Sequence, residues 1–222
     1  MTANTVKQWL STISTVLLVL CALVVTGLVV RRELFRPTDR LEMSFYEDWK
    51  ELTTAGNRLG DPGAPVQMVV FYDYQCPFCR SAAPTIEQLR AKYQDRIAIT
   101  FRHFLLESIH PQARAAALAA ECAADQGRFE MMHHVLFDNA TRLGNVPWER
   151  LAEEAGVPDI QTFTNCFVDG RHSDRIARDR MAVAMLGISS VPGFVINGTV
   201  VTGAKPFEVL DGLVQAALDE AA

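Results

Sequence analysis

The stretch "FYDYQCPFCRSAAP", Phe71 to Pro84, decides the fold, because two cysteines lie where a predicted strand meets a predicted helix. The preceding residues, from Val66 to Tyr72, are rich in valine and aromatic side chains, which predicts a largely buried strand. The segment "SAAPTIEQLRAKY" then carries apolar residues at helical spacing. Cys76 and Cys79 at this junction are candidates for half of a zinc site, a structural staple or a reactive redox pair.

The position favours a redox pair. Cys76 would lie at a helix N-terminus, where free backbone N–H groups and the helix dipole favour an anion. We therefore expect the pKa of its thiol to fall below the usual value of about 8.5. Cys79 follows one turn deeper and more shielded, and a disulfide can close between the two sulfurs. Pro77 suits the first helical turn, and Phe78 adds no charge.

This pattern predicts exchange through a mixed disulfide, in which Cys76 attacks or is attacked and Cys79 resolves the intermediate. A zinc site is disfavoured, because four ligands are needed and no second C-x-x-C or H-x-x-H follows. We therefore predict no metal and no other cofactor. A plain staple is also disfavoured, because so short a loop contributes little stability.

The elements after the pair complete an α/β pattern. "RIAITFRHF" predicts a second strand, and the helix between the two strands implies a parallel crossover. Several helices are predicted over about 108–187. The Asn197-Gly198 signal then predicts a hairpin with strands at 194–196 and 199–202, and a helix closes the chain. The expected fold is a mixed sheet with an all-helical insertion.

At this point the chain resembles the DsbA-type thioredoxin-fold oxidoreductases. The similarity is carried by "FYDYQCPFC", the helical insertion, "GISSVPGFVINGTVVTGA" and the closing helix, and it runs from about Trp49 to the C-terminus. It implies a thioredoxin-like fold with a cis Pro192 facing the cysteine pair. The peptide at Val191 would then offer its backbone to an extended substrate segment. A valine before this proline is more similar to the oxidases of the family than to the isomerases.

Two further cysteines, Cys122 and Cys166, fall in different predicted helices. From the residues alone they are free thiols, small buried hydrophobic side chains or a second disulfide. Because similar positions in some relatives carry paired cysteines, the resemblance implies a structural Cys122–Cys166 bond.

The chain departs from the family at the position six residues before Cys76. Thioredoxin-like relatives often carry a buried acid there, whereas this chain has Val70. Asp73 is the nearest acid and is a candidate proton acceptor for Cys79, expected to lie nearer the surface. The alternative interpretation is a solvated carboxylate at the strand end.

Three histidines also required an interpretation. Glu130 and His133 match a Glu-x-x-His half-motif of di-iron bundles, but no second copy follows, so we interpret the match as chance. His103 and His110 flank the loop after the second strand, and we interpret both as structural, with a position near the rim of the active site as the alternative for either.

The N-terminal part reads as an anchor. After a flank at 1–8, residues 9–30 carry no charged side chain, and 22 residues of helix span roughly 33 Å, enough for a hydrocarbon core of about 30 Å. A transmembrane helix is therefore predicted, with a cleaved signal peptide as the alternative. A buried core helix is less favoured, because such a helix seldom lacks a polar face over this length. Residues 31–63 are interpreted as a tether, and the folded domain is expected at 64–222.

These features predict a membrane-anchored protein-disulfide oxidoreductase. Its thiol or disulfide substrates would be extracytoplasmic proteins, and a membrane redox partner would recycle it. Four arginines after the anchor favour the opposite orientation, but large domains translocate largely regardless of charge. Introduction of disulfides is the favoured direction, with reduction or isomerisation as the alternative. A non-catalytic binding or metal-holding module is the alternative from another class. The net charge of −5 and the lack of a basic cluster argue against nucleic acid.

Overall fold

The computed structural model describes residues 17–28 and 43–221. The chain divides into two units, Met1–Leu41 and Glu42–Ala222, and each is described by itself. In the first unit, residues 17–28 form a helix with exposed side chains. Across the described ranges, no helix has both the length and the apolar character needed to cross a membrane. The predicted segment 9–30 lies partly outside these ranges and the flank 1–8 wholly outside, so the anchor stays a prediction.

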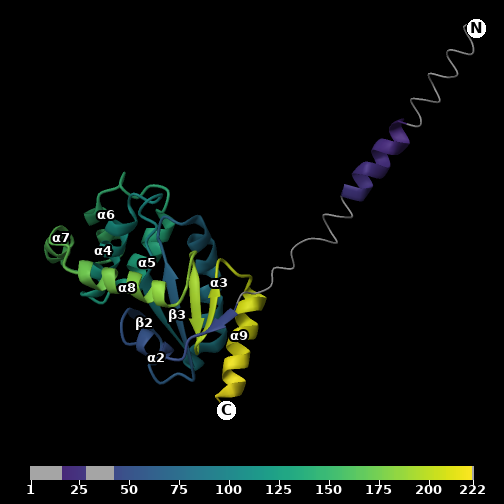
Figure 1. Cartoon of the computed structure of the whole chain (residues 1–222). Helices are drawn as coiled ribbons and strands as arrows, with labels where there is room; N and C mark the ends of the chain where they lie inside the picture. The colour runs from purple at the N-terminus through teal and green to yellow at the C-terminus, as the bar shows by residue number, and fades with distance from the viewer. Residues whose placement is uncertain (1–16, 29–42, 222) are drawn as a thin grey trace, which may run out of the picture. The chain divides into compact units, whose positions relative to one another are not determined.

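The second unit is built on a six-stranded mixed sheet (Figure 1). The strand order is β1-β6-β5-β3-β4-β2. The strands are β1 (Met43–Phe45), β2 (Asn57–Leu59), β3 (Val66–Tyr72), β4 (Ile97–His103), β5 (Gly193–Ile196) and β6 (Thr199–Thr202). The central pair β3 and β4 is parallel, whereas every other pair is antiparallel. The predicted parallel crossover and C-terminal hairpin are therefore confirmed.

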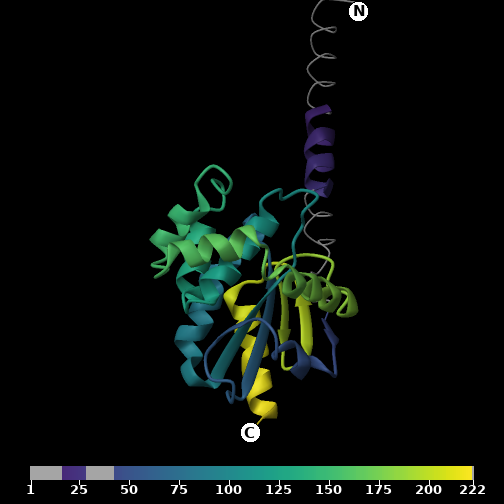
Figure 2. The same cartoon turned by 90° about the vertical axis from the view of Figure 1, so that its left-hand side faces the viewer.

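Helices occupy the connections of this sheet. They are α2 (Trp49–Leu52), α3 (Pro77–Tyr93), α4 (Ala113–Ala124), α5 (Phe129–Asp138), α6 (Trp148–Glu154), α7 (Ile160–Val168), α8 (Ser173–Met185) and α9 (Phe207–Glu220), with a 3-10 turn at Gln94–Arg96. In chain order, α4 to α8 lie between β4 and β5, which is the expected helical insertion. In Figure 2 the teal and green helices of this insertion gather beside the sheet.

β3 is buried along its whole length because helices cover both faces of the sheet. Met68 and Val70 pack into the larger core with residues of α3 and α9, whereas Val69 and Phe71 pack into a second core with residues of α8. A strand covered on both faces needs apolar side chains at successive positions, which explains the run of Val and aromatic residues. The central strand thus holds the start of α3 in a fixed place.

The interpretation of residues 31–63 as a tether is corrected for its second half. Both β1 and β2 fall within that range, and they form the two edges of the sheet. β1 pairs with β6 and β2 pairs with β4, and the side chain of Leu52 between them is buried. Three-residue strands carry too little periodicity to be recognised, and cross-strand hydrogen bonds to neighbours distant in sequence create them.

A disulfide inside the helical insertion and a buried set of hydrogen bonds to β4 hold the insertion in place. A disulfide joins Cys122 of α4 to Cys166 of α7, with Cα atoms 5.8 Å apart, which confirms the pair that the resemblance implied. On α8, Asp179 accepts hydrogen bonds from Nε of Arg102 at 2.7 Å and from the backbone N–H of His103 at 2.8 Å. All three residues are buried, so α8 is bonded to the end of β4.

Candidate active site

Cys76 lies at the junction between the buried strand and α3, as predicted. It is the N-cap residue of α3, with an extended backbone, and Pro77 occupies the first helical turn. Its N–H donates to the carbonyl of Asp73 at 3.1 Å, and its own carbonyl accepts the N–H of Arg80 at 3.0 Å. The turn is therefore closed on both sides of Cys76.

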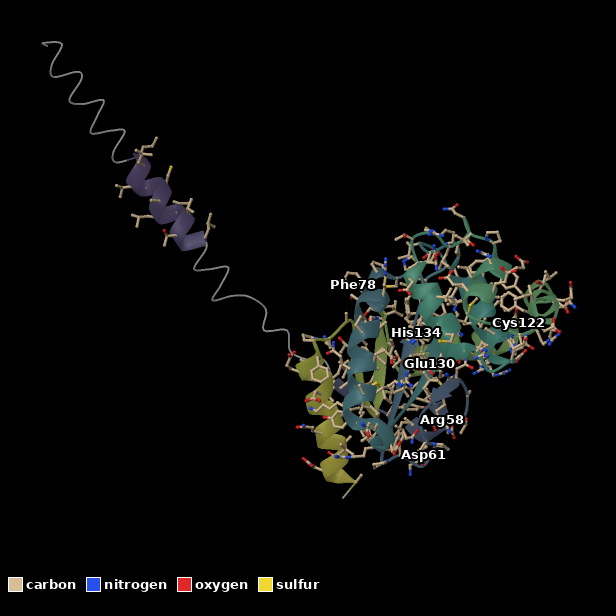
Figure 3. The ribbon with its side chains drawn as sticks, turned by 180° about the vertical axis from the view of Figure 1, so that it is seen from behind. Arg58, Asp61, Phe78, Cys122, Glu130 and His134 are labelled. Atoms are coloured by element: carbon tan, nitrogen blue, oxygen red, sulfur yellow. A yellow bond between two sulfur atoms is a disulfide. The ribbon has the colours of Figure 1, made fainter. Side chains whose placement is uncertain are left out.

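The two cysteines are covered by their neighbours. Cys76 is 3% exposed and Cys79 is 2% exposed, and both are free thiols, so this is the dithiol form. The sequence predicts Cys79 as the more shielded of the two, whereas Cys76 is nearly as well covered, because it also packs into the larger core. Phe78, by contrast, is 63% exposed at the N-terminal end of α3 (Figure 3).

The environment separates the acidities of the two thiols. A hydrogen bond from Cys79 lowers the pKa of Cys76 from 9.0 to about 6, assisted by backbone N–H groups of the first turn and by the charge of His110, against the opposing effect of burial. Burial raises the pKa of Cys79 strongly, and its hydrogen bond to Cys76 acts in the same direction. At neutral pH the site therefore holds a Cys76 thiolate beside a Cys79 thiol.

The Val191–Pro192 peptide bond is cis, as the resemblance implied. Gly193, the next residue, is paired with Phe71 at the C-terminal end of β3. Val191 is buried in the same core as Cys76 and Cys79. The cis peptide therefore lies at the C-terminal end of β3, where the cysteine turn begins.

Asp73 differs from its expected position near the surface. It is fully buried, and its Oδ1 accepts the N–H of Gln75 at 2.8 Å. Its Oδ2 accepts the N–H of Leu106 at 2.9 Å and lies 2.8 Å from Nδ1 of His110. The solvated-carboxylate interpretation is therefore wrong. The Asp73 charge also raises the pKa of Cys79, as a minor contribution after burial.

His110 is the site residue that sequence reasoning interpreted as structural. Its side chain is 14% exposed and bonded to Asp73. Because parallel strands end at the same edge of a sheet, the loop after β4 must lie beside the turn after β3, and a histidine in that loop was the available signal. His103 belongs elsewhere, since its Nε2 lies 2.8 Å from Oε1 of buried Glu121.

The candidate metal ligands do not form an open site. Glu130 and His133 have different partners: Glu130 pairs with Arg90 at 2.6 Å, and Nδ1 of His133 lies 3.1 Å from the hydroxyl of Tyr74. Within the described residues, Glu87 of α3 lies near Glu130 and His134 of α5, but Arg90 bridges the two carboxylates. Glu130 and His134 are labelled in Figure 3. The sulfurs near His172 are joined in the second disulfide.

A central buried strand, a cysteine pair at the start of the next helix and a cis-proline just before the neighbouring strand define a thioredoxin-like fold. Residues 53–216 match the family model described as Thioredoxin, so the chain belongs to that family.

Solved structures support the fold. A thioredoxin-like oxidoreductase from Silicibacter pomeroyi is 26% identical, with a TM-score of 0.65 over 73% of this chain and 92% of that one. BdbD from Bacillus subtilis, in its oxidised form, is 20% identical, with a TM-score of 0.63 over 73% and 92% of the two chains. At 20% identity, the similarity to BdbD shows the fold alone.

Curated relatives are longer proteins. A Na(+)/H(+) antiporter NhaA of Salinispora tropica is 35% identical over 73% of this chain, and one of Salinispora arenicola is 34% identical over 71%. The chain spans about a quarter of the length of these relatives, 24% in both cases.

Proposed function

We propose that this protein is a thiol-disulfide oxidoreductase that introduces disulfides into proteins outside the cytoplasm. The observation that carries the proposal is the placement of the pair, with Cys76 as the N-cap residue of α3 and Cys79 buried in the first helical turn. This placement lowers the pKa of Cys76 to about 6 and raises that of Cys79. Thiol-disulfide exchange needs one sulfur that leaves as a stable thiolate. Cys76 has that property, and the family and the related solved oxidoreductase support this class of reaction.

The reaction starts from the Cys76–Cys79 disulfide. A substrate thiolate attacks Sγ of Cys76, so a mixed disulfide forms, the Cys76–Cys79 bond breaks, and Cys79 takes up a proton. A second substrate thiolate then attacks the substrate sulfur of the mixed disulfide, and Cys76 leaves as the thiolate. The substrate has lost two electrons and the enzyme has gained them, so a redox partner must remove them before the next cycle.

The direction of exchange follows from which form of the enzyme is stabilised. A stabilised thiolate favours the dithiol, which makes the enzyme disulfide oxidising. The test is the reduction potential of Cys76–Cys79 in glutathione buffers, together with oxidation of a dithiol peptide. We expect a potential nearer about −120 mV than about −270 mV. A value near the lower figure, with insulin reduction, would replace the oxidase by a reductase.

The alternative from another class is a binding or metal-holding module that uses Cys76 and Cys79 as ligands. Metal content of the purified protein distinguishes the two. One tightly bound metal per chain without thiol oxidation or reduction would overturn the enzyme proposal.

We also propose that residues 9–30 anchor the domain in a membrane with residues 64–222 on the extracytoplasmic side. The uncharged run supports the anchor, and the Cys122–Cys166 disulfide is typical of oxidising compartments. The relatives named as antiporters support a membrane setting for domains of this kind. Protease treatment of spheroplasts or protoplasts, in which the cytoplasmic membrane is intact and its outer face is accessible, tests the topology. A domain that is digested only after the membrane is broken would show the opposite orientation.

A further inference from the structure

The cysteine turn itself carries no cation. Pro77 and Phe78 between the two cysteines are uncharged, and the first turn of α3 offers only backbone N–H groups. Arg80 follows Cys79, but it is exposed. Because water screens an exposed charge, a less exposed cation from a different segment would act more strongly on the Cys76 thiolate.

Asp73 brings a histidine from a different segment to the site. Its carboxylate is fully buried, and Oδ2 lies 2.8 Å from Nδ1 of His110. A buried carboxylate costs free energy unless it is paired or hydrogen-bonded, and the imidazole of His110 is the side chain that lies against it. The backbone carbonyl of the same residue accepts the N–H of Cys76 at 3.1 Å. Asp73 is therefore connected to the cysteine through its backbone and to the histidine through its side chain.

The loop that carries His110 is bonded to the cysteine turn at several points. The N–H of Phe104 donates to the carbonyl of Tyr72 at 2.9 Å, and the N–H of Leu106 donates to Asp73 at 2.9 Å. Beyond the histidine, the N–H of Gln112 donates to Oε1 of Gln75 at 2.5 Å. These bonds lie on both sides of His110, so the imidazole is held in one place relative to the turn.

We propose that His110 is the cationic partner of the Cys76 thiolate and that Asp73 is the residue that positions it. His110 supplies the positive charge that the uncharged side chain of Phe78 does not. This inference rests on the proposed function, because it explains how the oxidising disulfide is made. The charge of His110 contributes to the lowered pKa of Cys76, after the larger effect of the Cys79 hydrogen bond. Nearby on the same loop, Glu107 is paired with Arg114 at 2.6 Å.

The test compares three variants of the full chain in detergent micelles. His110→Gln removes the charge, His110→Lys restores a cation at the same position, and Arg80→Gln removes an exposed cation beside the cysteines as the matched control. Thiolate absorbance at 240 nm is titrated in each reduced protein, and the reduction potential is measured in glutathione buffers. Far-UV circular dichroism checks that each variant is folded.

We expect His110→Gln to raise the pKa of Cys76 by about one unit, which is a tenfold change in the thiol-thiolate equilibrium, and to make the disulfide less oxidising. His110→Lys should recover most of this change, and Arg80→Gln should have a smaller effect. Equal effects of His110→Gln and Arg80→Gln, or no recovery with His110→Lys, would overturn the proposal.

A second measurement uses the unmodified protein and does not depend on a variant that folds. By reciprocal linkage, a thiolate beside His110 must favour its imidazolium. In NMR titrations, His110 should release its proton at higher pH in the reduced protein than in the oxidised protein. Identical titrations in the two redox states would overturn the inference. A protein that shows the expected shift but oxidises no dithiol would overturn the proposed function and leave the pairing supported.

Discussion

The hydroxyl of Tyr74 lies 3.1 Å from Nδ1 of His133, so the residue two positions before Cys76 is bonded to α5 of the insertion. The hydroxyl of Tyr72 lies 3.0 Å from that of Tyr74, and all three side chains are buried. Burial lowers the pKa of His133 to about 3, with a smaller contribution from the charge of His134. The ring is therefore neutral at neutral pH, and a buried polar chain joins the active-site turn to the insertion.

Tyr74→Phe should lower the free energy of unfolding by about 1–3 kcal/mol, because it leaves a buried partner without its hydrogen bond. Urea denaturation measures the change. Tyr93→Phe is the comparison variant, since its hydroxyl bonds to Asp211 near the surface, where water can replace it. An equal loss of unfolding free energy in the two variants would show that burial of the Tyr72–Tyr74–His133 chain does not increase its contribution to stability.

Cys79→Ser should accumulate mixed disulfides between Cys76 and substrate proteins, because the resolving thiol is absent. Cys76→Ser should trap none and should have no oxidase activity. Non-reducing gels followed by mass spectrometry identify the sulfur that carries the adduct. Adducts found on Cys79 in the Cys76→Ser variant, at the same yield, would reverse the two roles.

The stability of the reduced protein should rise with pH between about 6 and 9. The pKa of Cys76 is about 6 in the folded protein and near 9.0 in the unfolded chain, so the unfolded chain binds more protons in this range. The gain is complete above the unfolded value and is lost as the pH falls through 6. Above about 9 stability should decline, because the raised pKa of Cys79 keeps that thiol protonated only in the folded state.

Urea denaturation of the reduced protein across this pH range measures the effect. The oxidised protein is the control, since its two sulfurs do not titrate, and Cys76→Ala should remove the rise. A parallel pH dependence in the oxidised protein would assign the effect to other groups.

Removal of the second disulfide should destabilise the insertion without changing the active site. For a sequence separation of 44 residues, the chain-entropy relation gives about 4 kcal/mol. The double variant Cys122→Ala with Cys166→Ala should show this loss in urea, while the pKa of Cys76 stays unchanged. A shifted Cys76 titration would mean that the bond also shapes the cysteine turn.

A cation placed inside the turn should substitute for His110. Phe78→His in the His110→Gln background should bring the reduction potential back toward that of the unmodified protein, because an imidazolium at either position stabilises the thiolate. In the otherwise unmodified protein the same change should make the disulfide more oxidising. No recovery in the double variant would indicate that the position of the charge, and not its presence, sets the potential.

The sequence by itself determined the central β-α-β unit, the hairpin and the cysteine junction. These features are local, because a buried run of valines, a helical repeat and an Asn-Gly turn each leave a pattern within a few residues of the chain. The position of Cys76 at a helix N-terminus followed from the same local reading, and so did the direction of its pKa shift.

The tertiary structure decided which distant residues meet the cysteine turn. The strands β1 and β2 exist because they pair with β6 and β4, and three residues alone leave no recognisable period. Asp73 is buried and paired because the loop after β4 covers it, which brings His110 from 37 positions away in the sequence. The predicted parallel strands indicate that these two loops meet, but which side chains bond between them depends on the folded path of the loops.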